Sequence, residues 1–491
     1  MSAGRLGEAL EYIKAGDYDV ALSNCRDVIE RHPGDADAVH LAGYLHQLKG
    51  EHEDALRYFA HAAQLAPRNA QILNNHAGSL KALGRLEESA RLYRRAIDLN
   101  PGFALAHHNF ADLLVTLERP AEATARCRAA LELEPGLADT YRTLGLALEH
   151  QGRYDEAIAA HRQSGALGGN RAAAEFGEAL VQLNLGNYTP GWEKYESRLE
   201  APSVRSLHER FDYPRWRGAS LAQRTLLVAR EQGLGDEIMF ASCFGETIGI
   251  AGRCFITCDR RLQPLFARSF PAATFVAGTE AELRERLARE AVDCQLPAGS
   301  QPLVFRARLQ DFPRHAGYLR ADPARVEHWR ARLAALGEGR AIGLSWRGGV
   351  PGTGRGRRSL PLEQLRPLLA LPRTRFVSLQ YGDVAGELAA LERNHGIRVE
   401  HWPEVIASSD ETAALISALD MTVSVCTAIV HLAGALGRPA WVMVPAVAEW
   451  RYGAKGENMP WYPSVRLFRQ GLAGEWQPVL DRVSAGLAAL H

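Results

Sequence analysis

Two different hydrophobic patterns divide the chain. Over the first 200 residues, apolar positions recur at helical spacing in short amphipathic stretches separated by turns that contain Gly and Pro. From about residue 205, runs of β-branched and aromatic residues alternate with amphipathic helical stretches; the runs are TLLVA, CFITC, TFVAG, AIGLSW, TRFVSLQ, MTVSVC and AWVMVP. Repeated strand–helix alternation is typical of a parallel sheet. The pattern therefore predicts an α plus α/β chain, helical first and α/β afterwards.

The helical part repeats with a constant step of 34 residues. Prolines stand at positions 33, 67, 101 and 135, and a small residue precedes each by 12 positions. Gly16, Gly50, Gly84 and Gly152 mark predicted turns, and Gly43 and Gly145 stand where paired helices pack closely. This pattern resembles the tetratricopeptide repeat, in which each 34-residue unit is two antiparallel helices. We expect five units over about residues 2–171 and a degenerate sixth that ends in LGNYTPGWEKYESRL.

Tetratricopeptide arrays stack into a superhelix whose concave face binds peptides or partner proteins. The first helix of each unit supplies candidates for that face: Asn74, Asn75, His107, His108 and Asn109. Amide side chains in a ladder are suited to hydrogen-bonding an extended acceptor peptide. A solvated helix face is the alternative interpretation for each of these residues.

Composition excludes some classes of function. The 491 residues contain 57 acidic and 57 basic side chains, so no overall charge favours binding to nucleic acid or to a membrane surface. The seven cysteines form no Cys-x-x-Cys pair, which favours free thiols in a reducing compartment over disulfides or a zinc site. No apolar run has the length of a signal peptide or a membrane span. These features predict a cytoplasmic protein.

The α/β part divides near the polar, Gly-containing segment GEGRAIGL, residues 337–344. Each side holds several strand–helix pairs, which predicts two Rossmann-like halves with ligands at the carboxyl ends of their strands. The expected domains are therefore a repeat domain at 1–200, a first α/β domain at 205–336 and a second at 337–491.

The segment SVCTAIVHLAGALGRP, residues 424–439, predicts a phosphate site. A buried strand ends at Cys426, and Thr427 stands at the N-cap of the following helix. His431 lies one turn later, on the same helix face as Thr427. A helix N-terminus with a hydroxyl and an imidazole beside it suits a phosphate. An ordinary capped helix with a core histidine is the alternative.

Two further segments carry cations and aromatic rings close to predicted strand ends. The loop RGGVPGTGRGRRS has arginines on a Gly-rich chain, at positions 347, 355, 357 and 358, and such residues suit closure over a phosphate or carboxylate. The tail supplies Trp450, Arg451, Trp461 and Tyr462. Their rings are candidates either for stacking on a nucleobase or sugar, or for ordinary core packing.

The segment REQGLGDEIMF, residues 230–240, places two acids where a Gly-rich turn after a strand usually receives a phosphate. Asp236 and Glu237 would repel a pyrophosphate there, and Ile238 stands where a dinucleotide fingerprint requires its third glycine. Gly233, Gly235 and an acid at Asp259 still leave a dinucleotide enzyme as an alternative. In the simplest interpretation, Asp236 caps a helix favourably against its dipole.

The order of these motifs resembles the bacterial tetratricopeptide-repeat glycosyltransferases. Their catalytic half is similar to the ADP-heptose:LPS heptosyltransferase family, which has the GT-B fold. The resemblance rests on EQGLGDEIMF, SWRGG, RRSLPLEQL, FVSLQ, ETAALISALDMTVSVCTAIVHLAGALGRP and PWYPSVRLFRQ. It implies an inverting transfer from a nucleotide-sugar to a protein hydroxyl, with no cofactor and no metal. Known members modify flagellin among other proteins.

The resemblance also implies roles for individual residues. Gly235 and Asp236 match the Gly-Asp that supplies the catalytic base, and Thr427, Ala428 and His431 match the donor-phosphate segment. Further donor-side positions are Gly235 itself, Ser345, Arg347, Arg357, Ser359, Gln380 and Glu411. Cys426 replaces the Asp that is usual before Thr427, which argues against a heptose-like donor. A nonulosonic acid from a CMP donor, with flagellin as acceptor, is the narrower expectation. A non-catalytic repeat scaffold with a degenerate transferase half is the alternative.

Overall fold

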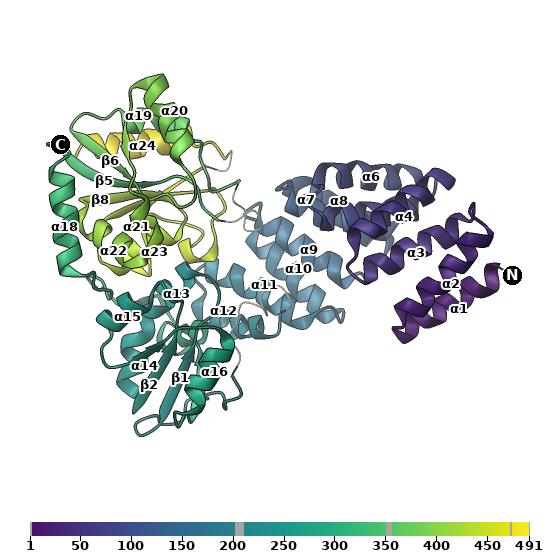
Figure 1. Ribbon diagram of the computed structural model, residues 1–491, viewed down its shortest axis with the longest axis horizontal. Helices are drawn as coiled ribbons and strands as arrows, with labels where there is room; N and C mark the ends of the chain where they lie inside the picture. Colours follow the sequence, from purple (N-terminus) through teal and green to yellow (C-terminus); the bar gives the residue numbers. More distant parts are fainter. Residues whose placement is uncertain (1, 202–210, 350–355, 472–473, 491) are drawn as a thin grey trace. The chain divides into compact units, whose positions relative to one another are not determined.

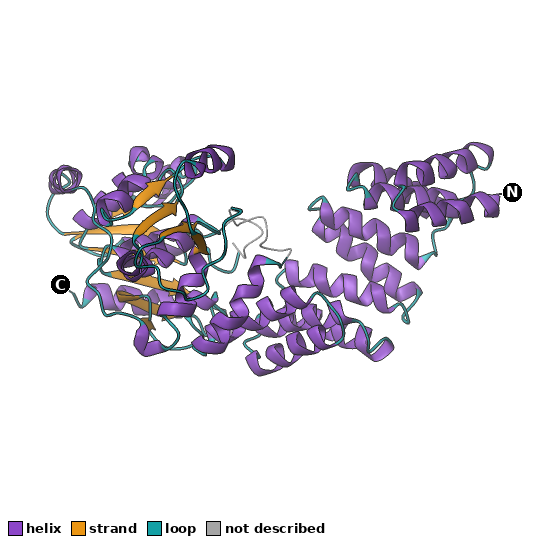
Figure 2. Cartoon of the chain, turned by 90° about the horizontal axis from the view of Figure 1, so that it is seen from below, coloured by secondary structure: helices purple, strands orange, loops and turns teal. Residues whose placement is uncertain are grey.

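The computed structural model describes residues 2–201, 211–349, 356–471 and 474–490. Contacts divide the chain into two compact units, residues 1–177 and 178–491, which are described separately (Figure 1). Among the described residues, every strand lies in the second unit, where helices flank the strands (Figure 2).

The first unit is a series of antiparallel helix pairs. Each of the four prolines at the 34-residue step lies in the turn between one pair and the next, where a helix has just ended. The helices are α1 (Ser2–Ala15), α2 (Tyr18–Arg31), α3 (Ala36–Leu48), α4 (His52–Leu65), α5 (Ala70–Ala82), α6 (Leu86–Leu99), α7 (Ala104–Thr116), α8 (Pro120–Leu133), α9 (Ala138–Glu149) and α10 (Tyr154–Ala166). Helix α11 (Arg171–Asn184) contains the division between the two units.

Small residues allow the paired helices to approach, as the spacing predicted. A Cβ atom added at Gly43 would lie 2.8 Å from the Phe59 ring, and one added at Gly145 would lie 2.7 Å from the His161 ring. Both distances are shorter than van der Waals contact. Glycine is therefore required at these two positions by packing.

The turn within each pair adopts left-handed backbone geometry. Gly16, Gly50, Gly84 and Gly152 have φ between +70° and +80°. The corresponding position of the fourth helix pair is Glu118, which keeps the same turn with φ +57°. The turn geometry therefore persists where its preferred residue is missing, because the packed helices on either side determine it.

The second unit begins with the end of α11, followed by α12 (Tyr188–Tyr195) and a 3-10 turn at Glu196–Leu199. The Trp192 indole is buried and donates to the Arg306 carbonyl at 2.9 Å. Rings of Tyr195, Trp450 and Trp461 surround it at 5.4–6.2 Å between centroids. The GWEKYE segment, which continues the repeats in sequence, therefore packs into the core of the α/β unit.

The first sheet has four parallel strands in the order β3-β2-β1-β4. They are β1 (Thr225–Ala229), β2 (Arg253–Thr257), β3 (Thr274–Val276) and β4 (Cys294–Pro297). Their helices are α13 (Leu234–Phe240), α14 (Phe244–Ile250), α15 (Gln263–Ser269), α16 (Glu280–Ala288) and α17 (Gln301–Phe305). Strand β4 was missed from sequence because CQLP is a short run that ends in proline.

The second sheet has the order β10-β11-β9-β8-β5-β6-β7 and is parallel except for the β10–β11 pair. Its strands are β5 (Arg340–Ser345), β6 (Thr374–Ser378), β7 (Val399–Glu400), β8 (Met421–Val425), β9 (Ala440–Val444), β10 (Asn458–Met459) and β11 (Tyr462–Arg469). Its helices are α18 (Pro323–Ala334), α19 (Arg366–Leu369), α20 (Ala385–His395), α21 (Pro403–Ala407), α22 (Ser409–Ala418), α23 (Ala428–Ala435) and α24 (Gln477–Ala488). The sequence interpretation treated PWYPSVRLFRQ as an aromatic tail, whereas most of it forms strand β11.

Strand order reverses at one point in each sheet: between β1 and β4 in the first, and between β5 and β8 in the second. Loops diverge at such switch points and leave a crevice at the carboxyl ends of the strands. Helix α13 follows β1 and helix α23 follows β8, and these two helices contact each other. The segments at residues 230–240 and 424–439, which the sequence analysis singled out, therefore both start at switch points.

No helix within the described ranges is both long enough and apolar enough to span a membrane.

Candidate active site

A cavity of about 580 Å³ lies at the carboxyl ends of the two sheets. The loop and helix after β1 contribute Gly233, Leu234, Gly235, Asp236 and Ile238, and Arg261 follows β2. The second sheet contributes Gly349, Arg358, Leu379, Tyr381, Ile406, Ser409, Thr412, Cys426, Thr427, Ala428, Ile429, His431, Leu432, Glu449, Arg451 and Tyr452. The expected base and the expected phosphate segment thus line one cavity.

Asp236 stands in the first turn of α13 and faces a cation from the other sheet. Its carboxylate accepts from the Arg451 Nε at 2.6 Å, and its other oxygen accepts from the Gly233 N–H at 3.4 Å. Both charged side chains are 15% exposed. Asp236 therefore caps its helix and faces the cavity at the same time.

Glu237 has a structural role. Its side chain is buried and accepts from the Asp259 N–H at 2.9 Å, just beyond the end of β2. The second acid of the Gly-Asp-Glu segment thus secures the helix to the neighbouring strand. Asp259 in turn holds Arg261 through two hydrogen bonds of 2.8 and 2.9 Å.

A buried ion pair holds the loop that precedes α13. Arg198, from the 3-10 turn after α12, donates to both carboxylate oxygens of Glu231 at 3.1 and 3.0 Å. A Cβ atom at Gly299 would overlap the Glu231 carboxylate, so the Glu231 side chain packs directly against the backbone of Gly299. The next residue, Gln232, has φ +64° and donates to the Tyr195 hydroxyl at 2.6 Å. Left-handed backbone at a non-glycine residue costs energy and is common beside functional sites.

Helix α23 begins as the sequence predicted. The Thr427 hydroxyl accepts from the Ile429 N–H at 3.2 Å and lies 3.2 Å from the Ser424 hydroxyl. Gly348 packs against this turn, because a Cβ atom there would lie 2.6 Å from the Cys426 carbonyl oxygen. The first turn of α23 contains no acidic residue, so its dipole is open to an anion.

His431 is buried one turn into α23 and lines the cavity. Its Nδ1 is hydrogen-bonded to the Tyr462 hydroxyl at 3.1 Å. Burial, together with the nearby charge of Arg451, lowers the pKa of His431 to about 3. The ring is therefore neutral near pH 7 and serves a ligand as a hydrogen-bonding group rather than as a charge.

Cys426 stands where relatives in the resemblance carry an acid, and its thiol is buried at the cavity wall. Burial raises the pKa of the Cys426 thiol, so it remains neutral. Charge at this end of the cavity comes instead from Arg358 and Glu449, which form an ion pair. The sequence motifs drew attention to Arg358 and Arg451 without assigning either to the site, and they gave no signal for Glu449.

Several of the expected donor-side residues do not line the cavity. The Gln380 amide oxygen accepts from the backbone N–H groups of Trp346 and Arg347 at 2.9 and 2.8 Å, and from the Ser345 hydroxyl at 3.2 Å. The Ser359 hydroxyl accepts from the Gly348 N–H at 3.2 Å. These side chains shape the loop after β5, and the Arg347 guanidinium lies 2.6 Å from Glu387.

Two expected donor-side residues remain, and the structure puts neither on the cavity wall. Glu411 accepts from the Trp329 indole of α18 at 2.8 Å and pairs with Arg325. Arg357 is described but is not a lining residue. Arg355 of the same loop lies outside the described residues.

The aromatic residues of the tail are packed in the core. Trp450, Trp461 and Tyr462 are buried, so their rings stabilise the fold. Tyr381, which follows β6, is 44% exposed at the cavity, and its hydroxyl donates to the Gly349 carbonyl at 3.0 Å. The sequence interpretation did not single out this ring, because periodicity does not distinguish the residue after a strand from any other loop residue.

The polar candidates of the repeat unit bind one another. The Asn109 amide donates to Asn74 at 3.0 Å, Asn74 donates to Asn75 at 3.0 Å, and Asn75 is hydrogen-bonded to His40. His108 is hydrogen-bonded to Thr140. Asn74 is buried, whereas Asn75, His108 and Asn109 are half-buried. These hydrogen bonds therefore connect successive helix pairs of the repeat part.

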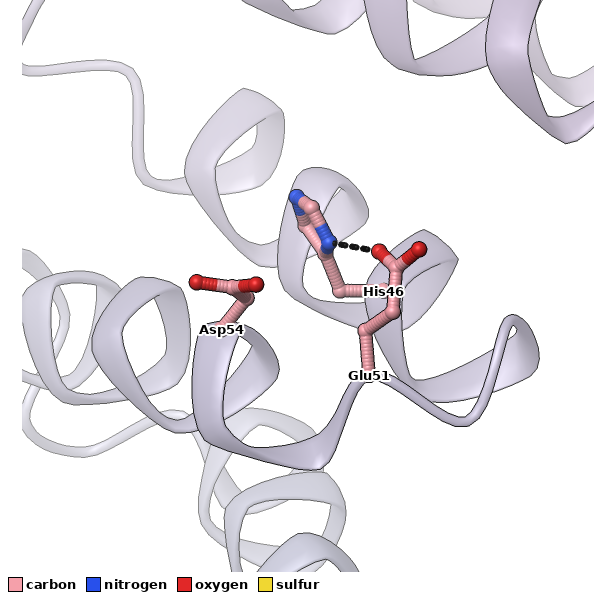
Figure 3. A group of neighbouring side chains, drawn as sticks. All are labelled: His46, Glu51 and Asp54. Carbon is pink, nitrogen blue, oxygen red and sulfur yellow. Dashed lines mark hydrogen bonds and ion pairs between the residues drawn. The ribbon is translucent and has the colours of Figure 1, made fainter.

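One group of potential metal ligands occurs within the described residues: His46, Glu51 and Asp54 at the turn between α3 and α4 (Figure 3). The Glu51 carboxylate already lies 2.6 Å from the His46 Nδ1 and 3.1 Å from the Lys49 ammonium. Because a cation of the protein neutralises this carboxylate, we assign no metal to the group.

Comparison with known proteins bears first on the repeat part. The tetratricopeptide-repeat family model matches residues 6–70, 42–102, 74–138 and 108–167. Solved structures similar to the chain include MamA (19% identity, 33% of this chain and 94% of that chain, TM-score 0.30). Another is the type IV pilus biogenesis factor PilW (21% identity, 41% and 93%, TM-score 0.38). The match of the family model identifies residues 6–167 as tetratricopeptide repeats.

The chain also has a curated relative. The chain is 37% identical over 333 residues to Protein FlbA of Caulobacter vibrioides (strain ATCC 19089 / CIP 103742 / CB 15), and the match covers 64% of this chain and 55% of FlbA. The chain thus spans about half the length of that relative. Because 64% of the chain exceeds the residues of its first unit, the similarity extends into the α/β unit.

Proposed function

We propose that the chain is an inverting, metal-independent glycosyltransferase of the GT-B fold that moves a sugar from a nucleotide donor to a Ser or Thr hydroxyl of a protein. One observation carries the proposal: a carboxylate, Asp236, and an acid-free helix N-terminus, that of α23, line one cavity. A base and an anion seat that line one cavity are what a single displacement at a glycosyl phosphate requires.

The proposed reaction is one in-line displacement. The acceptor hydroxyl oxygen forms a bond to the anomeric carbon while the bond from that carbon to the donor phosphate oxygen breaks. The proton of the hydroxyl passes to the Asp236 carboxylate, and the electron pair of the broken bond stays on the phosphate. A base in this position contributes about 10²- to 10⁴-fold to the rate.

The leaving phosphate is stabilised by groups of the protein. The first turn of α23 offers its dipole and the Thr427 cap, and Arg358 and Arg451 supply positive charge at the cavity wall. Neutral His431 adds a hydrogen bond. The exposed face of Tyr381 is the candidate surface for stacking of the nucleobase.

In this proposal residues 205–336 form the acceptor side, residues 337–491 form the donor side, and the repeats bind the acceptor protein. Protein binding is the general use of such arrays. Flagellin as acceptor and a CMP-linked nonulosonic acid as donor are the narrower form of the proposal. A carboxylated sugar suits a cavity that has arginines and lacks the usual acid at Cys426.

The test is transfer to a purified acceptor. The full chain is incubated with flagellin and with a panel of nucleotide-sugars that includes the CMP-linked acid, in the presence of a chelator, and the intact mass of the acceptor is measured. We expect a gain of one sugar residue per modified hydroxyl, with release of the nucleotide, and no gain with Asp236→Ala. An equal gain with Asp236→Ala would remove the base from the proposal, and loss of transfer with the chelator would remove its metal independence.

Two binding measurements, added to the transfer experiment, test the alternative that the chain is a non-catalytic scaffold. The Arg451–Asp236 ion pair is the observation that favours it, since the candidate base is already occupied. A scaffold would retain the acceptor protein on a column while binding none of the nucleotides and adding no mass. Nucleotide binding measured by calorimetry separates the two functions even when the right acceptor is missing.

A further inference from the structure

The pairing of Asp236 with Arg451 joins residues 215 positions apart in sequence. Each belongs to a different sheet region, and each side chain reaches the same cavity. The contact uses one carboxylate oxygen, while the other oxygen faces the Gly233 N–H at 3.4 Å. The proposed base is therefore held by a cation on the oxygen that does not cap its helix.

Arg451 lies in a row of alternating charges along the cavity wall. Its guanidinium is over the Trp450 ring, 4.9 Å from the centroid, and 3.8 Å from Glu449. Glu449 also pairs with Arg358, so the row runs Arg358, Glu449, Arg451, Asp236. Each of these four residues lines the cavity.

Arg451 lines the same cavity as the anion seat. Its charge contributes to the lowered pKa of His431, one turn into α23. Burial disfavours the charged form of Arg451, yet Asp236 and Glu449 raise the pKa of Arg451 above its usual range. A permanent cation thus pairs with the Asp236 carboxylate and lines the same cavity as the N-terminus of α23.

Two requirements of the proposed reaction meet at this residue. A general base must reach the proton that it abstracts, and the Asp236 oxygen that does not cap the helix is hydrogen-bonded to Arg451. The donor phosphate needs cations, and the arginines of the cavity are paired with acids: Arg261 with Asp259, Arg358 with Glu449 and Arg451 with Asp236. A movement of Arg451 from Asp236 to the donor phosphate would satisfy both requirements.

We propose that Arg451 is an exchangeable counter-ion, which pairs with Asp236 in the free protein and moves to the donor phosphate when the nucleotide binds. The exchange releases the Asp236 carboxylate to receive the proton of the acceptor hydroxyl. It also makes donor binding precede acceptor activation, because the base is occupied until the phosphate arrives. This inference rests on the proposed function.

The experiment measures nucleotide affinity rather than activity. CMP, CDP, UDP, GDP and ADP are titrated by calorimetry into the full-length wild type and into the variants Asp236→Asn, Arg451→Gln and the double variant. We expect Asp236→Asn to bind its nucleotide about threefold to tenfold more tightly, because Arg451 loses its competing partner. Arg451→Gln weakens binding, and Asp236→Asn added to Arg451→Gln produces no gain.

Asp259→Asn is the matched control, because it removes the same negative charge from the partner of another cavity arginine, Arg261. A general electrostatic effect would strengthen binding equally in both variants. Unchanged or weaker binding in Asp236→Asn, or equal strengthening in Asp259→Asn, overturns the exchange. Thermal unfolding of each variant confirms that it is folded.

Failure of this inference and failure of the proposed function give different results. Sugar transfer by the wild type with no gain in Asp236→Asn affinity overturns the exchange alone. A gain in affinity with no sugar transferred to any acceptor overturns the glycosyltransferase and leaves an anion site with an exchangeable arginine. No nucleotide bound by the wild type or by Asp236→Asn overturns both.

Discussion

Helices α13 and α23 occupy equivalent places in two sheets and have opposite chemistry. Each follows a strand beside a switch point and starts at the same cavity. Helix α13 has two acids in its first turn, Asp236 and Glu237, and a glycine as its N-cap. Helix α23 has no acid in its first turn and uses the hydroxyl of Thr427 as its cap.

The difference shows how one fold element serves two purposes. A helix N-terminus favours negative charge, which an internal carboxylate or an external anion can supply. Helix α13 satisfies its terminus with its own acid, Asp236, which lines the cavity and is the proposed base. Helix α23 has no acid in its first turn, so its terminus is open to an external anion. Predictions that alter the charge or the shape of either terminus therefore test the assignment.

The largest expected effect is the loss of transfer in Asp236→Ala. Without the carboxylate, the acceptor proton has no base, and the rate should fall about 10²- to 10⁴-fold. Single-turnover rates at saturating donor measure this loss. Glu280→Gln is the control, since Glu280 is an exposed acid in the first turn of α16, outside the cavity. A similar loss in the control would mean that helix charge, not a base, matters.

The second prediction gives α23 the acid that α13 has. Ala428 is half-buried at the cavity wall in the first turn of α23. Ala428→Asp should fold, because an acid there is favourable for the helix, yet it should weaken nucleotide binding about tenfold to a hundredfold by like-charge repulsion. Ala428→Asn has nearly the same shape without the charge. Calorimetry should show equal affinities for the two variants if no phosphate lies at this terminus.

The third prediction concerns pH, through His431. Its pKa is about 3 in the folded chain and near the usual value of about 6.5 when unfolded, so the unfolded state takes up the extra proton. The contribution of His431 to stability is complete above pH 6.5 and is lost as the pH falls. Between pH 7 and pH 5 the loss is about 2 kcal/mol.

Chemical unfolding of the wild type and of His431→Gln at both pH values measures this loss. The variant should be less sensitive to pH by about the stated amount. Equal slopes for the wild type and His431→Gln would show that the ring is not neutral in the folded chain.

The smallest effect tests shape rather than charge. Gly348→Ala would bring a Cβ atom to 2.6 Å from the Cys426 carbonyl oxygen, which belongs to the backbone before α23 and cannot move easily. We expect a loss of about 1 kcal/mol in unfolding free energy. Gly386→Ala, in helix α20, meets no atom within 4 Å and should instead be neutral or slightly stabilising. A stabilised Gly348→Ala would indicate a looser turn before α23.

Much of the fold could be predicted because its signals are local. The prolines at a 34-residue step predicted the helix pairs, and Gly43 and Gly145 proved to be close-packing positions. Strands with continuous β-branched runs, such as β1 and β8, were also predicted. Strand β4 was missed because four residues do not establish a period of two, and β11 was missed because Pro463 within the run counts against a strand.

The candidate site was predicted in part for the same reason. Asp236, Thr427 and His431 lie where helix-start signals predicted them, at strand–helix junctions. Gln380 and Ser345 carry the right chemistry but use it to hold the loop after β5. Whether a polar side chain faces a cavity or a backbone depends on which element packs against it, and a single segment of sequence does not contain that information.

The sequence by itself determined the repeat architecture, the α/β alternation and the two helix starts that carry the candidate chemistry, because each depends on residues within a few turns of one another. Only the tertiary structure decided that Arg451 meets Asp236, that Arg198 meets Glu231, and that Tyr381 is the exposed ring at the cavity. Those partners are tens to hundreds of residues apart. Their pairing follows from strand order and from burial that makes an unpaired charge costly, and neither is a property of a local pattern.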